Sequence, residues 1–126
     1  MTELLGRWVN QNGSVLVIEA VEDGRIRGAF ESKKGRAARG HAYPVTGTAN
    51  GELVSFAVSF DDGATNLASI TSFSGRLARD AQGVERLYTL WVLARQYEDD
   101  ARTKPTQVWN TFVTNTDVFT RMEDNE

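Results

Sequence analysis

The chain has 126 residues, enough for one domain whose core needs no disulfide or metal. It contains no cysteine and one histidine, which excludes disulfides and thiol nucleophiles and argues against multi-histidine metal sites and histidine-based catalysis. The net charge of −3 supplies no general attraction for nucleic acid or an anionic membrane. No apolar run approaches the roughly 18 residues that a membrane-spanning helix requires.

Short apolar or alternating runs, separated by turn signals, follow one another along the whole chain. Turns are expected at Asn12-Gly13, Asp23-Gly24, Lys34-Gly35, Asn50-Gly51, Asp62-Gly63 and Gln82-Gly83. Asn-Gly and Asp-Gly pairs suit hairpins because both central residues can adopt positive φ. The predicted strands are Leu5–Asn10, Ser14–Ala20, Arg25–Ser32, Ala42–Thr48, Glu52–Phe60, Leu67–Ala78, Glu85–Arg95 and Thr111–Met122. The spacing favours an all-β sandwich or up-and-down barrel, and eight strands suffice for a closed barrel that holds one small ligand.

The regions between these strands predict no helix and no domain boundary. The polar segment Gln96–Gln107, which contains Pro105, is expected to be a longer loop. Gly28 inside the third strand indicates a bend or close packing. We therefore expect a single domain over residues 1–126, with a frayed acidic tail at 123–126.

Strand alternation indicates which side chains point into the barrel. In the fifth strand Val54, Phe56, Val58 and Phe60 share the face expected to point inward. The matching faces of other strands contain Phe30 with Ser32, Thr71 with Phe73 and Ser69, and Phe119 with Asp117, Asn115 and Val113. The interior is thus predicted to combine aromatic rings, hydroxyls and one carboxylate.

Such an interior is unusual for a purely structural core, because buried polar groups need partners. A small polar ligand enclosed by aromatic walls would supply those partners. The sequence offers no nucleophile paired with a base and no pair of inward carboxylates, so we expect a binding protein and not an enzyme.

Six ordered segments resemble motifs of the avidin/streptavidin family, with similar spacing along nearly the whole chain. Gly6–Ser14 resembles G-x-W-x-N-x-x-G-S, and Gly28–Ser32, followed by Gly35, resembles G-x-Y-x-S with the binding loop after it. The other four are Tyr43–Gly47, Ser69–Gly75 (S-x-T-x-W-x-G), Leu90–Leu93 (T-x-W-L-L) and Trp109 with Asp117–Arg121 (W-x(7)-D-x-F-T-[RK]). Each motif is weak alone, whereas the ordered set is specific.

The resemblance implies an eight-stranded antiparallel up-and-down barrel that binds biotin and does no chemistry on it. Biotin is then the ligand, and no cofactor or metal is expected. The implied partners are biotin and other copies of the chain, in a homotetramer or alternatively a dimer, with no nucleic acid and no membrane. The resemblance also implies a secreted or periplasmic protein, although Met1–Leu5 shows no signal peptide.

The resemblance also implies a role for each site residue. Asn10, Ser14 and the tyrosine position taken by Phe30 would surround the ureido oxygen, and Asp117 and Ser32 would accept from the ureido N–H groups. Thr71 would face the sulfur, and Ser69 with backbone N–H groups near Arg36 and Ala37 would hold the carboxylate. The apolar walls would be Phe60, Phe73 and Trp91, and Trp109 would cap the site of a neighbouring subunit.

The chain departs from the family pattern at several of these positions. Phe30 replaces a tyrosine, and Phe60 and Phe73 replace tryptophans, so we expect tight binding that is weaker than in the extreme members. Phe112, Thr114 and Asn115 replace the usual T-x-V-G of the last strand, which alters the expected subunit interface.

Simpler interpretations stand beside these roles. The aromatic residues can be ordinary barrel core, the serines and threonines ordinary strand residues, and Asn10 a turn residue. Asp117 needs a donor, which Asn10 or a tryptophan N–H could provide without any ligand. The pocket could also suit another small ligand, or the barrel could bind only protein subunits.

Overall fold

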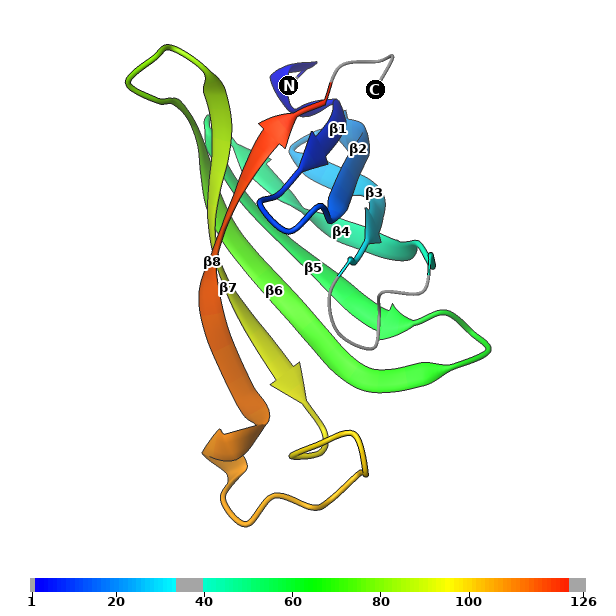
Figure 1. Cartoon of the computed structure of the whole chain (residues 1–126). Helices are drawn as coiled ribbons and strands as arrows, with labels where there is room; N and C mark the ends of the chain where they lie inside the picture. Colours follow the sequence, from blue (N-terminus) through cyan, green and yellow to red (C-terminus); the bar gives the residue numbers. More distant parts are fainter. Residues whose placement is uncertain (1, 34–39, 123–126) are drawn as a thin grey trace.

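The computed structural model describes residues 2–33 and 40–122 of the chain. Eight strands form a closed barrel in chain order, and every strand pairs antiparallel with its neighbours (Figure 1). The predicted all-β up-and-down barrel is therefore confirmed. The expected fraying of residues 123–126 falls outside the described residues.

The strand boundaries agree closely with the prediction, since no end moves by more than two residues. The strands are β1 (Gly6–Val9), β2 (Val15–Glu22), β3 (Arg25–Glu31), β4 (Tyr43–Asn50), β5 (Leu53–Asp61), β6 (Asn66–Arg79), β7 (Glu85–Arg95) and β8 (Phe112–Arg121). Where no helix was expected, the described residues include two 3-10 helices, η1 (Thr2–Leu4) and η2 (Val108–Thr111). Neither is long and apolar enough to cross a membrane.

Five of the predicted turns lie between strands of the described residues, and most of them have positive φ at the glycine alone. The predicted turn at Lys34-Gly35 lies outside the described residues. At Asp23-Gly24 both residues have positive φ, 52° and 74°, as a tight turn of the I′ kind requires. At Asn50-Gly51 and Asn12-Gly13 only the glycine has positive φ.

Gly28 marks a close approach between β2 and β3, as its place in the strand predicted. A Cβ atom at Gly28 would lie 2.0 Å from the carbonyl oxygen of Val17. The β2–β3 register also shifts between Ile18 and Ala20. Only a residue without a side chain lets the two backbones approach this closely.

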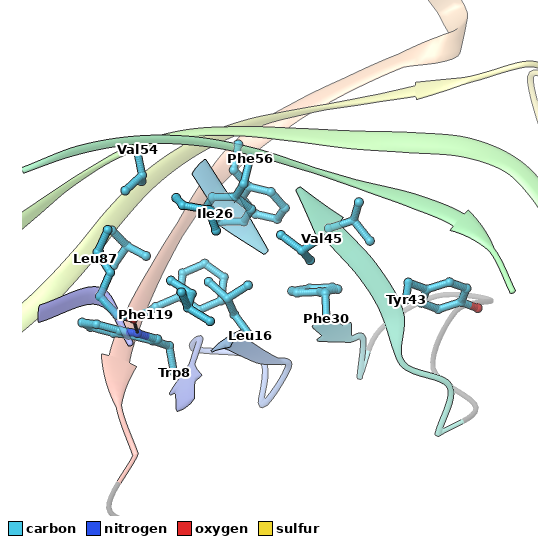
Figure 2. Close-up of a cluster of buried hydrophobic side chains, with 14 of the residues drawn as sticks. Trp8, Leu16, Ile26, Phe30, Tyr43, Val45, Val54, Phe56, Leu87 and Phe119 are labelled. Carbon is cyan, nitrogen blue, oxygen red and sulfur yellow. Dashed lines mark hydrogen bonds between the residues drawn. The ribbon is translucent and has the colours of Figure 1, made fainter. Parts of the chain in front are cut away.

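The barrel interior holds the core. The predicted alternation is confirmed in β5 but only in part in β8, where Asp117 and Phe119 are buried whereas Val113 and Asn115, expected on the same inward face, are exposed because β8 continues past β1. In β5 the inward side chains Val54, Phe56, Val58 and Phe60 are buried. Trp8, Leu16, Leu87 and Phe119 fill the interior between the first and last strands, and Figure 2 shows them with Phe30 and Phe56 in one cluster. Aromatic and branched side chains thus fill one end of the barrel.

The closure between β1 and β8 is short. It consists of two residue pairs, Trp8 with Arg121 and Val9 with Thr120, whereas β6 and β7 pair over eleven residues from Ser69 to Arg79. In Figure 1 the blue β1 lies beside the red end of β8, and the orange part of β8 continues past β1. The long strands β6, β7 and β8 therefore extend one wall of the barrel beyond the short N-terminal strands.

Candidate functional site

The open end of the barrel contains a cavity of about 390 Å³. It lies where β7 ends and β6 begins, opposite the filled end. The predicted site residues that line it are Asn10, Ser14, Phe30, Ser32, Phe60, Ser69, Thr71, Phe73, Trp91 and Asp117. Strand alternation and the family resemblance thus led to residues that the fold brings together. Arg36 and Ala37 lie outside the described residues.

Asp117 is the buried carboxylate of the cavity, with 7% of its surface exposed. Asn10 Nδ2 donates to its Oδ2 at 3.1 Å, and Gln11 Nε2 donates to its Oδ1 at 2.7 Å. Gln11 also accepts a hydrogen bond from Val118 N through Oε1, at 3.0 Å. Both carboxylate oxygens therefore have a donor, and the burial cost of the charge is offset.

Asn10 is both a turn residue and a site residue. Its Oδ1 accepts from the backbone N–H groups of Asn12 at 3.0 Å and Ser14 at 2.9 Å, which shapes the β1–β2 turn. Because the amide oxygen is occupied by those donors, the amide nitrogen is turned toward Asp117. The second hydrogen of that nitrogen remains to serve another acceptor.

The hydroxyl residues of the inner cavity are also oriented by backbone groups. Ser14 Oγ accepts from Lys33 N at 2.8 Å, so the serine proton is directed to a different acceptor. Ser32 and Thr71 are buried beside the cavity. Below them, Thr89 donates to the Asp117 carbonyl oxygen at 2.8 Å and holds the β8 backbone at this position.

Aromatic rings form the walls. Phe30 lies 5.9 Å from Phe73 and 6.5 Å from Phe60 between ring centroids. Phe73 also stacks on Phe56, at 4.6 Å. Across the β6–β7 pair Trp91 faces Phe73, and its buried Nε1 has no hydrogen-bond partner among the described residues. An unpaired buried N–H is a feature that a ligand or water can satisfy.

The mouth contains residues that the sequence analysis missed: Asn12, Leu67, Ala68, Leu93, Arg95, Tyr97, Asp99 and Asp100. Leu93 and Arg95 could have been found, because they share the inward parity of Trp91. Ala68 could not, since it enters the wall through a register shift between β5 and β6 and a positive φ of 53°.

The predicted loop Gln96–Gln107 folds against the start of β6 and forms the rest of the mouth. Gln96 N donates to the Ala68 carbonyl oxygen at 2.9 Å, and Arg102 Nη2 donates to Asn66 O at 3.0 Å. The Arg102 guanidinium also lies over the Tyr97 ring, 5.2 Å from its centroid. Hydrogen bonds from Thr103 lower the pKa of Asp99, so its carboxylate is ionised at neutral pH.

Trp109 does not line the cavity of its own chain. It belongs to η2, is 76% exposed, and packs against Phe112 with ring centroids 5.5 Å apart. The role predicted for it is in a neighbouring subunit, so it stays a prediction for the assembled protein.

Comparison with known proteins gives a consistent result. Afifavidin from Afifella pfennigii is 31% identical over 90 residues, which are 71% of this chain and 56% of afifavidin. The match therefore spans little more than half the length of that relative. The structure of apo shwanavidin superposes with a TM-score of 0.78 at 27% identity, covering 94% of this chain and all of that one. The structure of a shwanavidin variant in complex with biotin superposes with a TM-score of 0.77 at 28% identity, covering 97% of this chain and 100% of that one.

A family model settles the relationship. The model of the avidin family matches residues 1–122, which include every strand and every cavity residue. The chain therefore belongs to the avidin family, whose members are non-catalytic binding proteins.

Proposed function

We propose that this protein binds biotin in the open end of its barrel and leaves it chemically unchanged. The observation that carries this proposal is the buried Asp117 carboxylate, held by Asn10 and Gln11 at the polar floor of an aromatic cavity. Biotin presents two N–H donors and one carbonyl oxygen on a compact ureido ring. Asp117 is suited to accept from one N–H group and Ser32 from the other.

The ureido oxygen needs donors, and the floor supplies two. One is the second hydrogen of Asn10 Nδ2, and the other is the Ser14 hydroxyl, whose oxygen is already occupied by Lys33 N. Phe30 stands where a tyrosine hydroxyl would be a third donor. One missing hydrogen bond costs about 0.5–3 kcal/mol, so the affinity should be high but below that of the strongest relatives.

The walls suit the apolar part of the ligand. Phe60, Phe73 and Trp91 would enclose the bicyclic ring, and Thr71 would face its sulfur. Phenylalanine offers less contact area than tryptophan but still packs against a ring. Ser69, nearer the mouth, would contact the carboxylate of the tail.

The test is a calorimetric titration of the wild-type protein with biotin, repeated on Asp117→Ala. We expect a single saturable binding event and a loss of well over tenfold in affinity for the variant. Glu22→Ala, an exposed carboxylate at the end of β2, is the matched control and should bind like the wild type. Biotin should also raise the melting temperature, because a ligand that binds only the folded state stabilises it.

No heat and no melting shift with biotin would refute the proposal. A melting shift with a different small polar molecule would then support the alternative, an avidin-type barrel whose pocket has changed its ligand. The observation that supports this alternative is that phenylalanines stand at one tyrosine and two tryptophan positions of the family pattern, Phe30, Phe60 and Phe73.

We also infer that the protein assembles with further copies of itself, as a tetramer or alternatively a dimer. The outward side chains Tyr88, Leu90 and Val92 of β7 are exposed, Leu90 to 66%, and Val108 and Trp109 of η2 are exposed as well. Apolar surface of this kind is typical of an interface. Trp109 would then cap the cavity of a neighbouring copy.

Light scattering at micromolar concentration tests the assembly. A mass of two or four chains is expected, and a monomer mass would refute it. If Trp109 caps a neighbour's site, Trp109→Ala should weaken biotin binding although its own cavity is intact. Val108→Ala, which removes an adjacent exposed apolar group, controls for a general change in the surface.

A further inference from the structure

Arg95 brings a positive charge into the wall of the cavity. It is the last residue of β7, and its register partner across the β6–β7 pair is Ser69. Both residues line the cavity near its mouth. Among the described lining residues Arg95 alone is positively charged.

Two backbone carbonyls hold the Arg95 guanidinium in place. Its Nε donates to Thr111 O at 3.3 Å, and its Nη2 donates to Asn110 O at 2.7 Å. These bonds use two of the five N–H donors of the group. They fix the plane of the guanidinium and leave both Nη1 hydrogens and one Nη2 hydrogen for another acceptor.

No described carboxylate forms an ion pair with Arg95 within 4.0 Å, although the Arg95 charge contributes, after the hydrogen bonds from Thr103, to lowering the pKa of Asp99. Asp99 and Asp100 also line the mouth, and Asp99 accepts a hydrogen bond from Thr103 N at 3.2 Å. Lys33 is paired with Glu31 at 2.6 Å. With two aspartates at the mouth, attraction of an anion must depend on direct hydrogen bonds from Arg95 more than on a general positive field.

We propose that Arg95, together with Ser69, binds the carboxylate of the ligand's tail and makes the pocket select a free carboxylic acid over its neutral amide. This inference rests on the proposed biotin binding. A half-buried, pre-oriented guanidinium matches the two oxygens of a carboxylate. An amide places one N–H group against the same donors and carries no charge.

The experiment compares biotin with biotinamide, in which the carboxylate is replaced by an uncharged amide, on the assembled wild-type protein and on Arg95→Gln. Calorimetry should show that Arg95→Gln weakens free biotin about tenfold, as expected for loss of a charged hydrogen bond at a partly exposed site. The affinity for biotinamide should change less than twofold in the same variant. Arg76→Gln, an exposed arginine on β6 beside Glu52, removes the same charge and should alter neither ligand.

The outcomes separate this inference from the function on which it rests. If the wild type binds neither molecule, biotin binding itself is wrong. If the wild type binds biotin but Arg95→Gln weakens both ligands equally, or neither, the selective role of Arg95 is overturned. If Arg95→Gln does not fold, Arg95→Lys is used instead, because it keeps the charge but loses the planar guanidinium. Arg95→Lys should still weaken the binding of biotin more than the binding of biotinamide.

Discussion

Gln11 ties Asp117 to the backbone of its own strand. The glutamine amide donates to Asp117 Oδ1 at 2.7 Å and accepts from Val118 N at 3.0 Å. The side chain thereby continues the β1–β8 contact two residues past Val9 and Thr120, the last paired residues. One residue thus joins the closure of the barrel to the orientation of the carboxylate that we expect to bind ligand.

Replacing Gln11 should therefore lower both the affinity for the ligand and the stability of the fold. In Gln11→Ala, Asp117 loses one donor and Val118 N loses its acceptor, but water can partly replace both because Gln11 is exposed. We expect biotin affinity to fall about threefold to tenfold and the melting temperature to drop by a few degrees. Calorimetry and thermal melting measure the two effects. Gln82→Ala, in the exposed β6–β7 turn, should change neither, and an unchanged affinity in Gln11→Ala would contradict the role of Gln11.

Restoring a hydroxyl at Phe30 should tighten binding. Phe30 is buried and lines the same cavity as Ser14 and Asn10, so a tyrosine there would add a hydroxyl donor to that cavity. We expect Phe30→Tyr to bind biotin about twofold to tenfold more tightly, the value of one net hydrogen bond.

The matched control is Phe56→Tyr. Phe56 stacks on Phe73 but lies outside the cavity, so its new hydroxyl would be buried without a ligand to meet it. That variant should lose stability and gain no affinity. Equal titration curves for Phe30→Tyr and the wild type would show that position 30 does not reach the ureido oxygen.

Relieving the backbone strain at Ala68 should stabilise the free protein. Ala68 has a φ of 53°, which costs an alanine roughly 1–2 kcal/mol relative to glycine. Ala68→Gly should raise the free energy of unfolding by up to about 1 kcal/mol, measured by urea denaturation. Ala57→Gly, in the middle of regular β5, should lower it by about 0.5–1 kcal/mol. Destabilisation of both by the same amount would show that the φ of Ala68 is not strained.

Adding one methyl group at Gly28 should prevent normal packing of β2 against β3. The new Cβ would meet the Val17 carbonyl oxygen at 2.0 Å, and two paired strands would have to separate. We expect Gly28→Ala to be unfolded or strongly destabilised by circular dichroism. Gly51→Ala meets open space and costs only the strain of its φ of 59°, roughly 1–2 kcal/mol. A normal melting curve for Gly28→Ala would contradict the close approach.

Most of the barrel could be predicted from the sequence because strand alternation and turn residues act locally. The inward face of β5, the cavity lining by Thr71 and Phe73 and the Asp23-Gly24 turn all follow from neighbouring residues. Leu93 and Arg95 also obey this alternation, since they follow Trp91 at every second residue of β7.

Other parts of the site depend on contacts that no local pattern contains. Gln11 reaches Asp117 across 106 positions, and an exposed glutamine after a strand gives no signal of such a bond. Ala68 enters the wall because β5 and β6 change register, which alternation cannot predict. Tyr97 and Asp99 reach the mouth because Arg102 anchors their loop to Asn66, a contact between distant segments.

The short closure between β1 and β8 also determines when the cavity can form during synthesis. Translation releases Asn10 and Ser14 first, and Asp117 emerges 107 residues after Asn10. Until then the growing chain has the aromatic walls and the Asn10 and Ser14 donors but not the carboxylate that completes the polar floor. A ligand of this site would therefore give no help to a nascent or C-terminally truncated chain, and would stabilise only molecules whose last strand has returned to the first.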